Sequence, residues 1–141
     1  MIFIAYSGFL LKIGNYEFPQ KYIRPSTYLA YVNMQDIDPY TDANGYLHRE
    51  AVELKASKVE FETIPMLTNK EFSKIMGSIR SNYIESKSRK GLITAYIPEY
   101  DDYVTQTGYM VDITPQIYGT YGNEIHYDPV RFAFVGGVAD D

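Results

Sequence analysis

Side chains that carry out nucleophilic, redox or metal chemistry are scarce in this sequence. Its 141 residues include no cysteine and no tryptophan, and its two histidines are His48 and His126. Without cysteine the chain can form no disulfide, no thiolate zinc site and no cysteine nucleophile. It also contains no HExxH motif, no nucleophile-elbow serine and no glycine-rich phosphate loop. We therefore predict that the protein is not an enzyme and has no catalytic, cofactor-binding or metal-binding residues.

Both histidines lie beside charged residues, which is the arrangement expected of a general acid or base. His48 is followed by an arginine and a glutamate, and His126 lies two residues after Glu124. A general base also needs a positioned partner and a cleft, and the sequence indicates neither. Packing at the surface or at an interface is therefore the role predicted for both rings.

The segment Asp36–Gly45 reads DIDPYTDANG and places oxygen ligands at alternate positions before a glycine, as calcium loops do. With Gly45 at the glycine position of such a loop, Tyr40 replaces the first aspartate and Ala51 replaces the bidentate glutamate. Asp and Asn are also the residues that tight turns use, and Asn-Gly is a strong hairpin signal. The segment therefore predicts a turn, with an ion site as the open alternative.

Two short segments of opposite charge are candidates for contacts with other molecules. Glu99–Tyr103 reads EYDDY, and tyrosines beside carboxylates suit a sugar or a basic protein surface. Lys87–Lys90 reads KSRK, but a net charge of −5 does not favour binding to nucleic acid. Each segment could be a solvated loop. Alternatively, the two could meet between copies of the protein in a head-to-tail ring.

Fifteen tyrosines provide broad rings with polar tips, which are suited to half-buried surfaces and protein contacts. We expect the polar loops Gln35–Tyr46 and Glu99–Gly108, together with the final strand, to dock on neighbouring proteins. The residues predicted to form interfaces are Tyr40, Asp42, Tyr46, Lys87, Arg89, Lys90, Tyr100, Asp101, Asp102 and Tyr103.

One amphipathic helix is predicted over residues 69–84. Thr68 and Glu71 have the spacing of a capping box, and the positions after them carry apolar residues at helical intervals. A helix with a single apolar stripe packs most economically against a sheet. Gly77 costs about 1 kcal/mol relative to alanine, so it could serve the close approach of a neighbouring backbone.

The rest of the chain shows the alternation and turn signals of strands. The strands are predicted around residues 9–13, 26–34, 47–63 with a bend near 56–57, 91–97, 109–113 and 130–135. Turns are expected at Asn44-Gly45, Gly122-Asn123 and Asp128-Pro129. We predict one mainly β domain over residues 1–141, a small β-sandwich or barrel with the helix on its flank. The N-terminus lacks a basic region, and no apolar run approaches the ~20 residues of a membrane span, so neither a secretory signal nor membrane insertion is predicted.

Several blocks along the chain together carry a family resemblance. They are IRPSTY (23–28), QDID (35–38), DANGYLHR (42–49), KVEF (58–61), IRSNY (79–83), YIPEY (96–100) and YDPVRFAF (127–134). With them, the chain resembles a family of short proteins encoded among the tail genes of phages and prophages of Gram-positive bacteria. The resemblance covers nearly the whole chain, and it brings no catalytic residues with it.

The resemblance implies a minor structural protein of the phage tail near the junction of tube and baseplate, with a fold like those of tail-tube and distal-tail proteins. It implies a homo-oligomeric ring, a hexamer rather than a trimer, in contact with tail-tube, distal-tail or hub proteins. DNA would be passing cargo, which an acidic inner wall would repel. Such a protein resides in the virion tail and is assembled in the host cytoplasm. Two alternatives stay open. One is a carbohydrate-binding module at the tail tip, with Tyr100, Tyr103 and Tyr109 as stacking rings. The other is an enzyme that hydrolyses cell-wall material with carboxylate pairs around Asp36–Asp42 or Glu99–Asp102.

Overall fold

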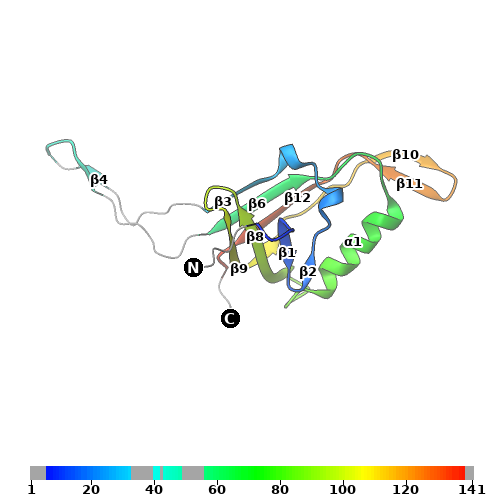
Figure 1. Ribbon diagram of the computed structural model, residues 1–141, viewed down its shortest axis with the longest axis horizontal. Helices are drawn as coiled ribbons and strands as arrows, with labels where there is room; N and C mark the ends of the chain where they lie inside the picture. The colour runs from blue at the N-terminus through cyan, green and yellow to red at the C-terminus, as the bar shows by residue number, and fades with distance from the viewer. Residues whose placement is uncertain (1–5, 33–39, 42, 49–55, 139–141) are drawn as a thin grey trace.

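The computed structural model describes residues 6–32, 40–41, 43–48 and 56–138. Within these ranges the chain is mainly β, with one α-helix, α1 (Asn69–Ser81), and two 3-10 helices, η1 (Gln20–Tyr22) and η2 (Pro25–Thr27). The strands are β1 (Leu11–Ile13), β2 (Tyr16–Glu17), β3 (Leu29–Val32), β4 (Tyr40–Thr41), β5 (Leu47–His48), β6 (Ser57–Glu62), β7 (Leu67–Thr68), β8 (Lys90–Ile97), β9 (Asp102–Met110), β10 (Ile117–Tyr121), β11 (Glu124–Tyr127) and β12 (Arg131–Gly136). The predicted class, mainly β with one helix, is confirmed (Figure 1).

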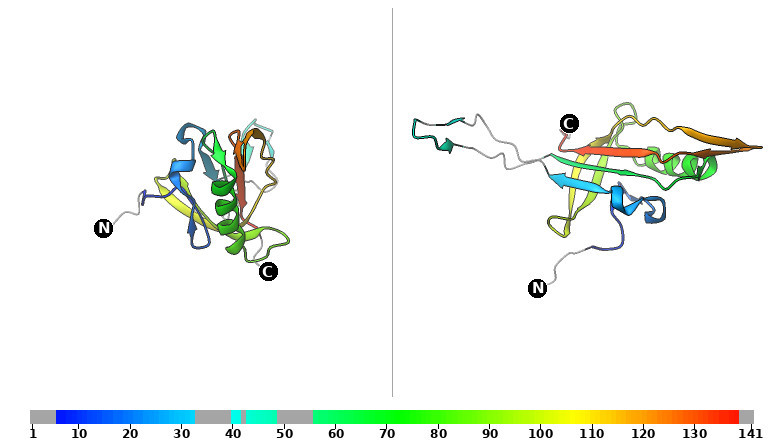
Figure 2. Two further views of the ribbon diagram at one scale, coloured as in Figure 1. Left: turned by 90° about the vertical axis from the view of Figure 1, so that its right-hand side faces the viewer. Right: turned by 90° about the horizontal axis from the view of Figure 1, so that it is seen from above.

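Seven antiparallel strands form one sheet in the order β2-β1-β8-β9-β12-β6-β3. The sheet curls on itself, so that β3 lies beside β8 although these two strands are not hydrogen-bonded to each other (Figure 2). The Tyr28 hydroxyl joins the two halves, since it lies 2.6 Å from the Tyr96 carbonyl oxygen and 3.0 Å from that of Leu10. Burial raises the pKa of Tyr28 well above that of an exposed tyrosine. Two smaller sheets accompany this curled sheet in the described residues, one of three strands in the order β10-β11-β7 and one of two strands, β4-β5.

A row of three glycines crosses the middle of this sheet. Gly108 in β9 pairs with Gly91 in β8 on one side and with Gly136 in β12 on the other. All three are buried, and a side chain at Gly108 would collide with the Val135 carbonyl oxygen. Glycine in a strand interior marks such close approaches of backbone. At Gly108 the absence of a side chain therefore allows β12 to approach β9 closely.

Aromatic rings fill the space inside the curled sheet. Phe18 lies 4.9 Å from Phe61 and 5.3 Å from Phe132 between ring centroids, and both pairs meet edge to face. All three rings are almost completely buried. Leu11 and Ile13 of β1 are fully buried, as the predicted alternation requires, and β1 begins only after Phe9. The core therefore draws on residues far apart in the sequence.

The predicted capping box begins α1 at the expected residue. The Glu71 N–H donates to the Thr68 hydroxyl oxygen at 3.2 Å, and the Thr68 N–H donates back to the Glu71 carboxylate at 3.1 Å. That second bond is the main reason why the pKa of Glu71 is lowered. Ile75, Met76 and Ile79 are buried against the sheet.

The helix ends at Ser81 and not at residue 84. The side-chain nitrogen of Asn82 donates to the Ser78 carbonyl oxygen at 2.8 Å, and the side-chain oxygen of Asn82 accepts the Asn15 N–H at 3.0 Å. Asn82 is the C-cap of α1, and its bond to Asn15 ties the end of the helix to the β1–β2 turn. The expected packing of a backbone against Gly77 is also wrong within the described residues, because Gly77 is exposed and nothing lies within 4 Å of the position of its missing Cβ.

Replacing Thr68 with alanine is expected to destabilise the fold by about 1 kcal/mol, since one helix N–H loses its acceptor. Urea unfolding monitored by circular dichroism would measure the change. Ser73→Ala is the matched control, because Ser73 is exposed in the same helix and should alter stability by less than about 0.5 kcal/mol.

Because the pKa of Glu71 is lowered by folding, its stabilising contribution is present above the unfolded-state pKa and is lost as the pH falls through the lowered value.

Two strand predictions need correction. The segment Glu99–Gly108, expected as a loop, contains the last three residues of a turn and then residues 102–108 of β9, and the strand expected at 109–113 ends at Met110. The polar residues of β9 are typical of a loop, but in the folded chain they have partners on other strands. Thr105 pairs with Thr94, and the Gln106 side chain accepts hydrogen bonds from Ser57. The final strand lies between β9 and β6. The interface role expected of it would therefore use a face of the sheet and not a free strand edge.

Candidate functional site

The two ends of the β8–β9 hairpin carry the opposite charges predicted from the sequence. At one end, a tight turn connects Ile97 to Asp102 and presents an acidic, aromatic surface. The Tyr100 N–H donates to the Ile97 carbonyl oxygen at 3.0 Å, and Asp101 adopts a positive φ of 48°. The Tyr96 hydroxyl donates to the Asp101 carboxylate at 2.6 Å, and this bond raises the pKa of Tyr96. Tyr100, Asp101 and Asp102 are all exposed, as a contact surface requires.

Tyr103 is predicted to belong to this surface, but its contacts are largely internal. Its ring stacks on Phe9 at 4.6 Å, and its hydroxyl donates to the Phe9 carbonyl oxygen at 2.8 Å. The same hydroxyl accepts the Ser7 N–H at 2.8 Å. Tyr103 therefore anchors Ser7 and Phe9 of the N-terminal segment to β9.

The basic residues lie at the other end of the hairpin. A turn over residues 86–89 brings Lys90 close to Glu85, whose carbonyl oxygen accepts the Lys90 N–H at 3.1 Å. Lys87 is exposed, whereas Lys90 and Arg89 are half-buried. Arg89 forms an ion pair with the exposed Asp112, which lies just after β9. The three predicted basic residues thus lie within one turn, about 25 Å from the acidic turn at ~3.3 Å per strand residue.

A groove of about 740 Å³ runs between α1 and this basic end. Apolar atoms from Phe72, Met76, Met110, Ile113 and Pro115 line it, with Arg80, Tyr83, Ser86, Arg89, Asp112 and Thr114 as its polar members. Burial raises the pKa of Tyr83, while the positive charges of Arg89 and Arg80 act in the opposite direction. The sequence did not predict the groove, because its walls come from three separated segments.

The third predicted contact region is the Asp36–Gly45 segment. Asn44-Gly45 does form a hairpin turn, with Gly45 at a φ of +85°, between the paired strands β4 and β5. Tyr40 lies in β4, and Tyr46, with 71% of its surface exposed, follows the turn. Asp42 and Asp36 lie outside the described residues, so neither the ion site nor their predicted contact roles are tested. Figure 1 shows this hairpin apart from the curled sheet.

His126 is the histidine whose side chain the structure describes, and it is packed as predicted. Its Nε2 lies 2.6 Å from the Glu124 carboxylate, and its ring meets Tyr121 edge to face at 4.8 Å. Glu124 and Tyr121 belong to the β10–β11 hairpin, which turns at the predicted Gly122-Asn123. This hairpin extends beyond the end of the curled sheet beside α1 (Figure 1).

The alternative of a sugar-binding platform finds no support in the arrangement of its three rings. Tyr100 is 52% exposed at the acidic turn, whereas Tyr109 pairs with Lys90 at the basic end. The ring of Tyr103 is occupied by Phe9. Among the described residues, no group of three or more histidine or carboxylate side chains is placed to hold a metal ion. In the same residues, no helix has the length and apolar character needed to cross a bilayer.

Comparisons with known proteins were consistent with this fold. The model of a family described as "Family of unknown function (DUF6711)" matches residues 4–137. No curated protein matches the sequence. The fold is similar to that of a chain in the tail of an empty gene transfer agent particle with C6 symmetry, at a TM-score of 0.54 and 13% identity over 94% of this chain and 92% of that one. A chain of the native gene transfer agent virion gives a TM-score of 0.53 at 12% identity, with the same coverage of both chains.

Proposed function

We propose that this chain, which belongs to the DUF6711 family, is a structural subunit of a phage tail and assembles with copies of itself into a ring. The observation that carries the proposal is the shared fold, which covers over nine-tenths of both this chain and a chain from a tail with C6 symmetry. A sixfold tail makes a hexamer a better expectation than a trimer. The family resemblance of the sequence blocks leads to the same kind of particle.

The surface of the chain supports a role in assembly. Strand β10 exposes Ile117, Tyr118 and Tyr121, and each of these residues is more than half accessible to solvent. Exposed apolar and aromatic side chains of this kind are typical of protein contacts. The net charge of −5 suits a protein past which DNA slides without being held. Glu60 and Glu62 line one described cleft, but each is paired with an arginine, Arg131 and Arg24 respectively, which favours a structural role over an enzymatic one.

The finer assignment is a minor tail protein near the junction of tube and baseplate, in contact with tail-tube, distal-tail or hub proteins. The protein would then reside in the virion tail and would be assembled in the cytoplasm of a Gram-positive host. The predicted contact residues of the β4–β5 hairpin, Tyr40, Asp42 and Tyr46, would meet those neighbours. Membrane insertion has no part in this assignment.

Electron microscopy of the purified chain is the direct test, because ring assembly predicts closed particles of six subunits. The chain is examined alone and after co-expression with the proteins encoded beside it, and its position is then located in the intact particle. A chain that stays monomeric at high concentration under all these conditions would contradict the proposal. So would measurable turnover of cell-wall material by the purified protein.

A further inference from the structure

The acidic turn has the form of a small projection with a fixed shape. Backbone hydrogen bonds across Ile97–Asp101 and the bond from Tyr96 to Asp101 hold it in place. Tyr100 stands at its tip with 52% of its surface exposed, next to the exposed carboxylates of Glu99 and Asp101. A pre-ordered aromatic side chain loses little conformational entropy on binding, so this tip is suited to act as an anchor.

The groove beside α1 has the complementary properties. Its apolar lining suits an aromatic ring, and Tyr, Trp and Arg are the residues that most often dominate a protein contact. Its charged lining residues are two arginines, Arg80 and Arg89, and one aspartate, Asp112. Because the pair between Arg89 and Asp112 is largely exposed, it is weak, and an incoming carboxylate can take the place of Asp112.

We infer that the acidic turn of one copy docks in the groove of the next copy, with Tyr100 on the apolar lining and the flanking carboxylates beside Arg80 and Arg89. The inference deepens the proposed ring assembly and rests on it. It assigns the partner as a second copy of this chain, because both complementary surfaces are present on one molecule.

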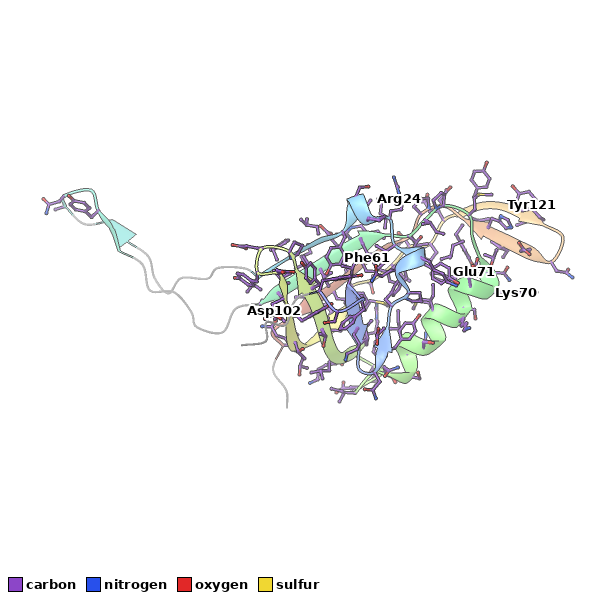
Figure 3. The ribbon with its side chains drawn as sticks, in the orientation of Figure 1. Arg24, Phe61, Lys70, Glu71, Asp102 and Tyr121 are labelled. Atoms are coloured by element: carbon purple, nitrogen blue, oxygen red, sulfur yellow. The ribbon has the colours of Figure 1, made fainter. Side chains whose placement is uncertain are left out.

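The contact cannot form within a single chain. The paired residues of the β8–β9 hairpin run from Lys90 opposite Tyr109 to Ile97 opposite Asp102, so the turn and the basic end are at opposite ends of a rigid ladder. In Figure 3, Asp102 likewise lies on the side of the molecule away from Tyr121 and the first turn of α1. A contact between two different surfaces of identical copies is head to tail, and it produces a ring when the rotation closes.

Disulfide cross-linking gives a sharp test, since the chain has no native cysteine. The variants Glu99→Cys, beside the tip, and Ser86→Cys, in the groove, are mixed under mild oxidation. Ser73→Cys, at an exposed position of α1 outside the groove lining, replaces Ser86→Cys in the control mixture. We expect the Glu99–Ser86 mixture to give several-fold more mixed dimer than the control, with a yield that falls as salt is added. Equal yields in the two mixtures would overturn the inference.

Tyr100→Ala tests the anchor itself. We expect it to weaken self-association, measured by sedimentation, about tenfold or more. Leu29→Ala, which truncates a similarly exposed side chain on β3 outside the groove lining, is the matched control and should have a smaller effect. If Tyr100→Ala forms rings as readily as the wild type, this contact is wrong while ring assembly stands. If the wild type forms no ring but the mixed disulfide still appears, the contact stands and ring formation by the chain alone is wrong.

Discussion

Replacing Phe132 with alanine is expected to destabilise the fold by about 3–5 kcal/mol, because it opens a cavity that the surrounding sheet cannot fill by collapse. The ring is fully buried and lies within 5.7 Å of Phe61 and 5.3 Å of Phe18 between centroids. It also packs against Phe72 of α1 at 6.4 Å, so it joins the helix to both halves of the sheet. Denaturant unfolding followed by circular dichroism would measure the loss.

A milder variant protects this prediction against a protein that does not fold at all. Phe132→Leu keeps most of the apolar volume and should cost less than half as much as the alanine variant. Tyr118→Ala, on an exposed strand, should change stability by less than about 0.5 kcal/mol. A cost for Phe132→Ala no larger than that of the Tyr118 variant would mean that the aromatic cluster is not the core of the fold.

Gly108→Ala is expected to be destabilising by more than about 3 kcal/mol, which is a large effect for the addition of one methyl group. The new Cβ would lie 2.9 Å from Gly136 Cα and closer still to the Val135 carbonyl oxygen, both of which are backbone atoms of the central strand. Because a backbone atom cannot rotate away, β9 and β12 must separate. Thermal unfolding monitored by circular dichroism would show the loss, with a lower midpoint than that of the wild type.

Gly77→Ala provides the matched control, since it adds the same methyl group in open space. Nothing in the described structure lies within 4 Å of the new Cβ, and alanine favours the helical backbone. This variant should be stabilising by about 0.5–1 kcal/mol. If both substitutions shift the midpoint in the same direction, the tight crossing at the glycine row is not present in solution.

The parts of the fold that sequence patterns predicted are those in which periodicity and local capping act together. The α1 helix begins where Thr68 and Glu71 place it, and the buried faces of β8 and β12 follow simple apolar runs. The end of the helix was not predictable, because Asn82 bonds to a turn more than sixty residues earlier. Strand β9 was misassigned because its polar residues find partners on other strands, which a local pattern does not contain.

The candidate contact surfaces divide in the same way. The exposed acidic turn is a local feature, and Tyr100, Asp101 and Asp102 lie on it as predicted. Tyr103 has the same composition around it, yet its ring and hydroxyl are used by Phe9 and Ser7. The groove could not be predicted, since Phe72 and Ile113 become neighbours only when the helix and the segment after β9 pack together.

The position of β12 has a consequence for how the subunit is made. Residues 131–136 form the last of the described strands in chain order, yet they lie between β9 and β6. Until they emerge, a nascent chain has two unsatisfied backbone edges and no closed interior. Because such non-local pairing is slow to form, we expect the sheet to be completed only after β12 has been synthesised. A chain truncated before residue 131 would lack the strand that joins β9 to β6 and would have no completed surface for assembly.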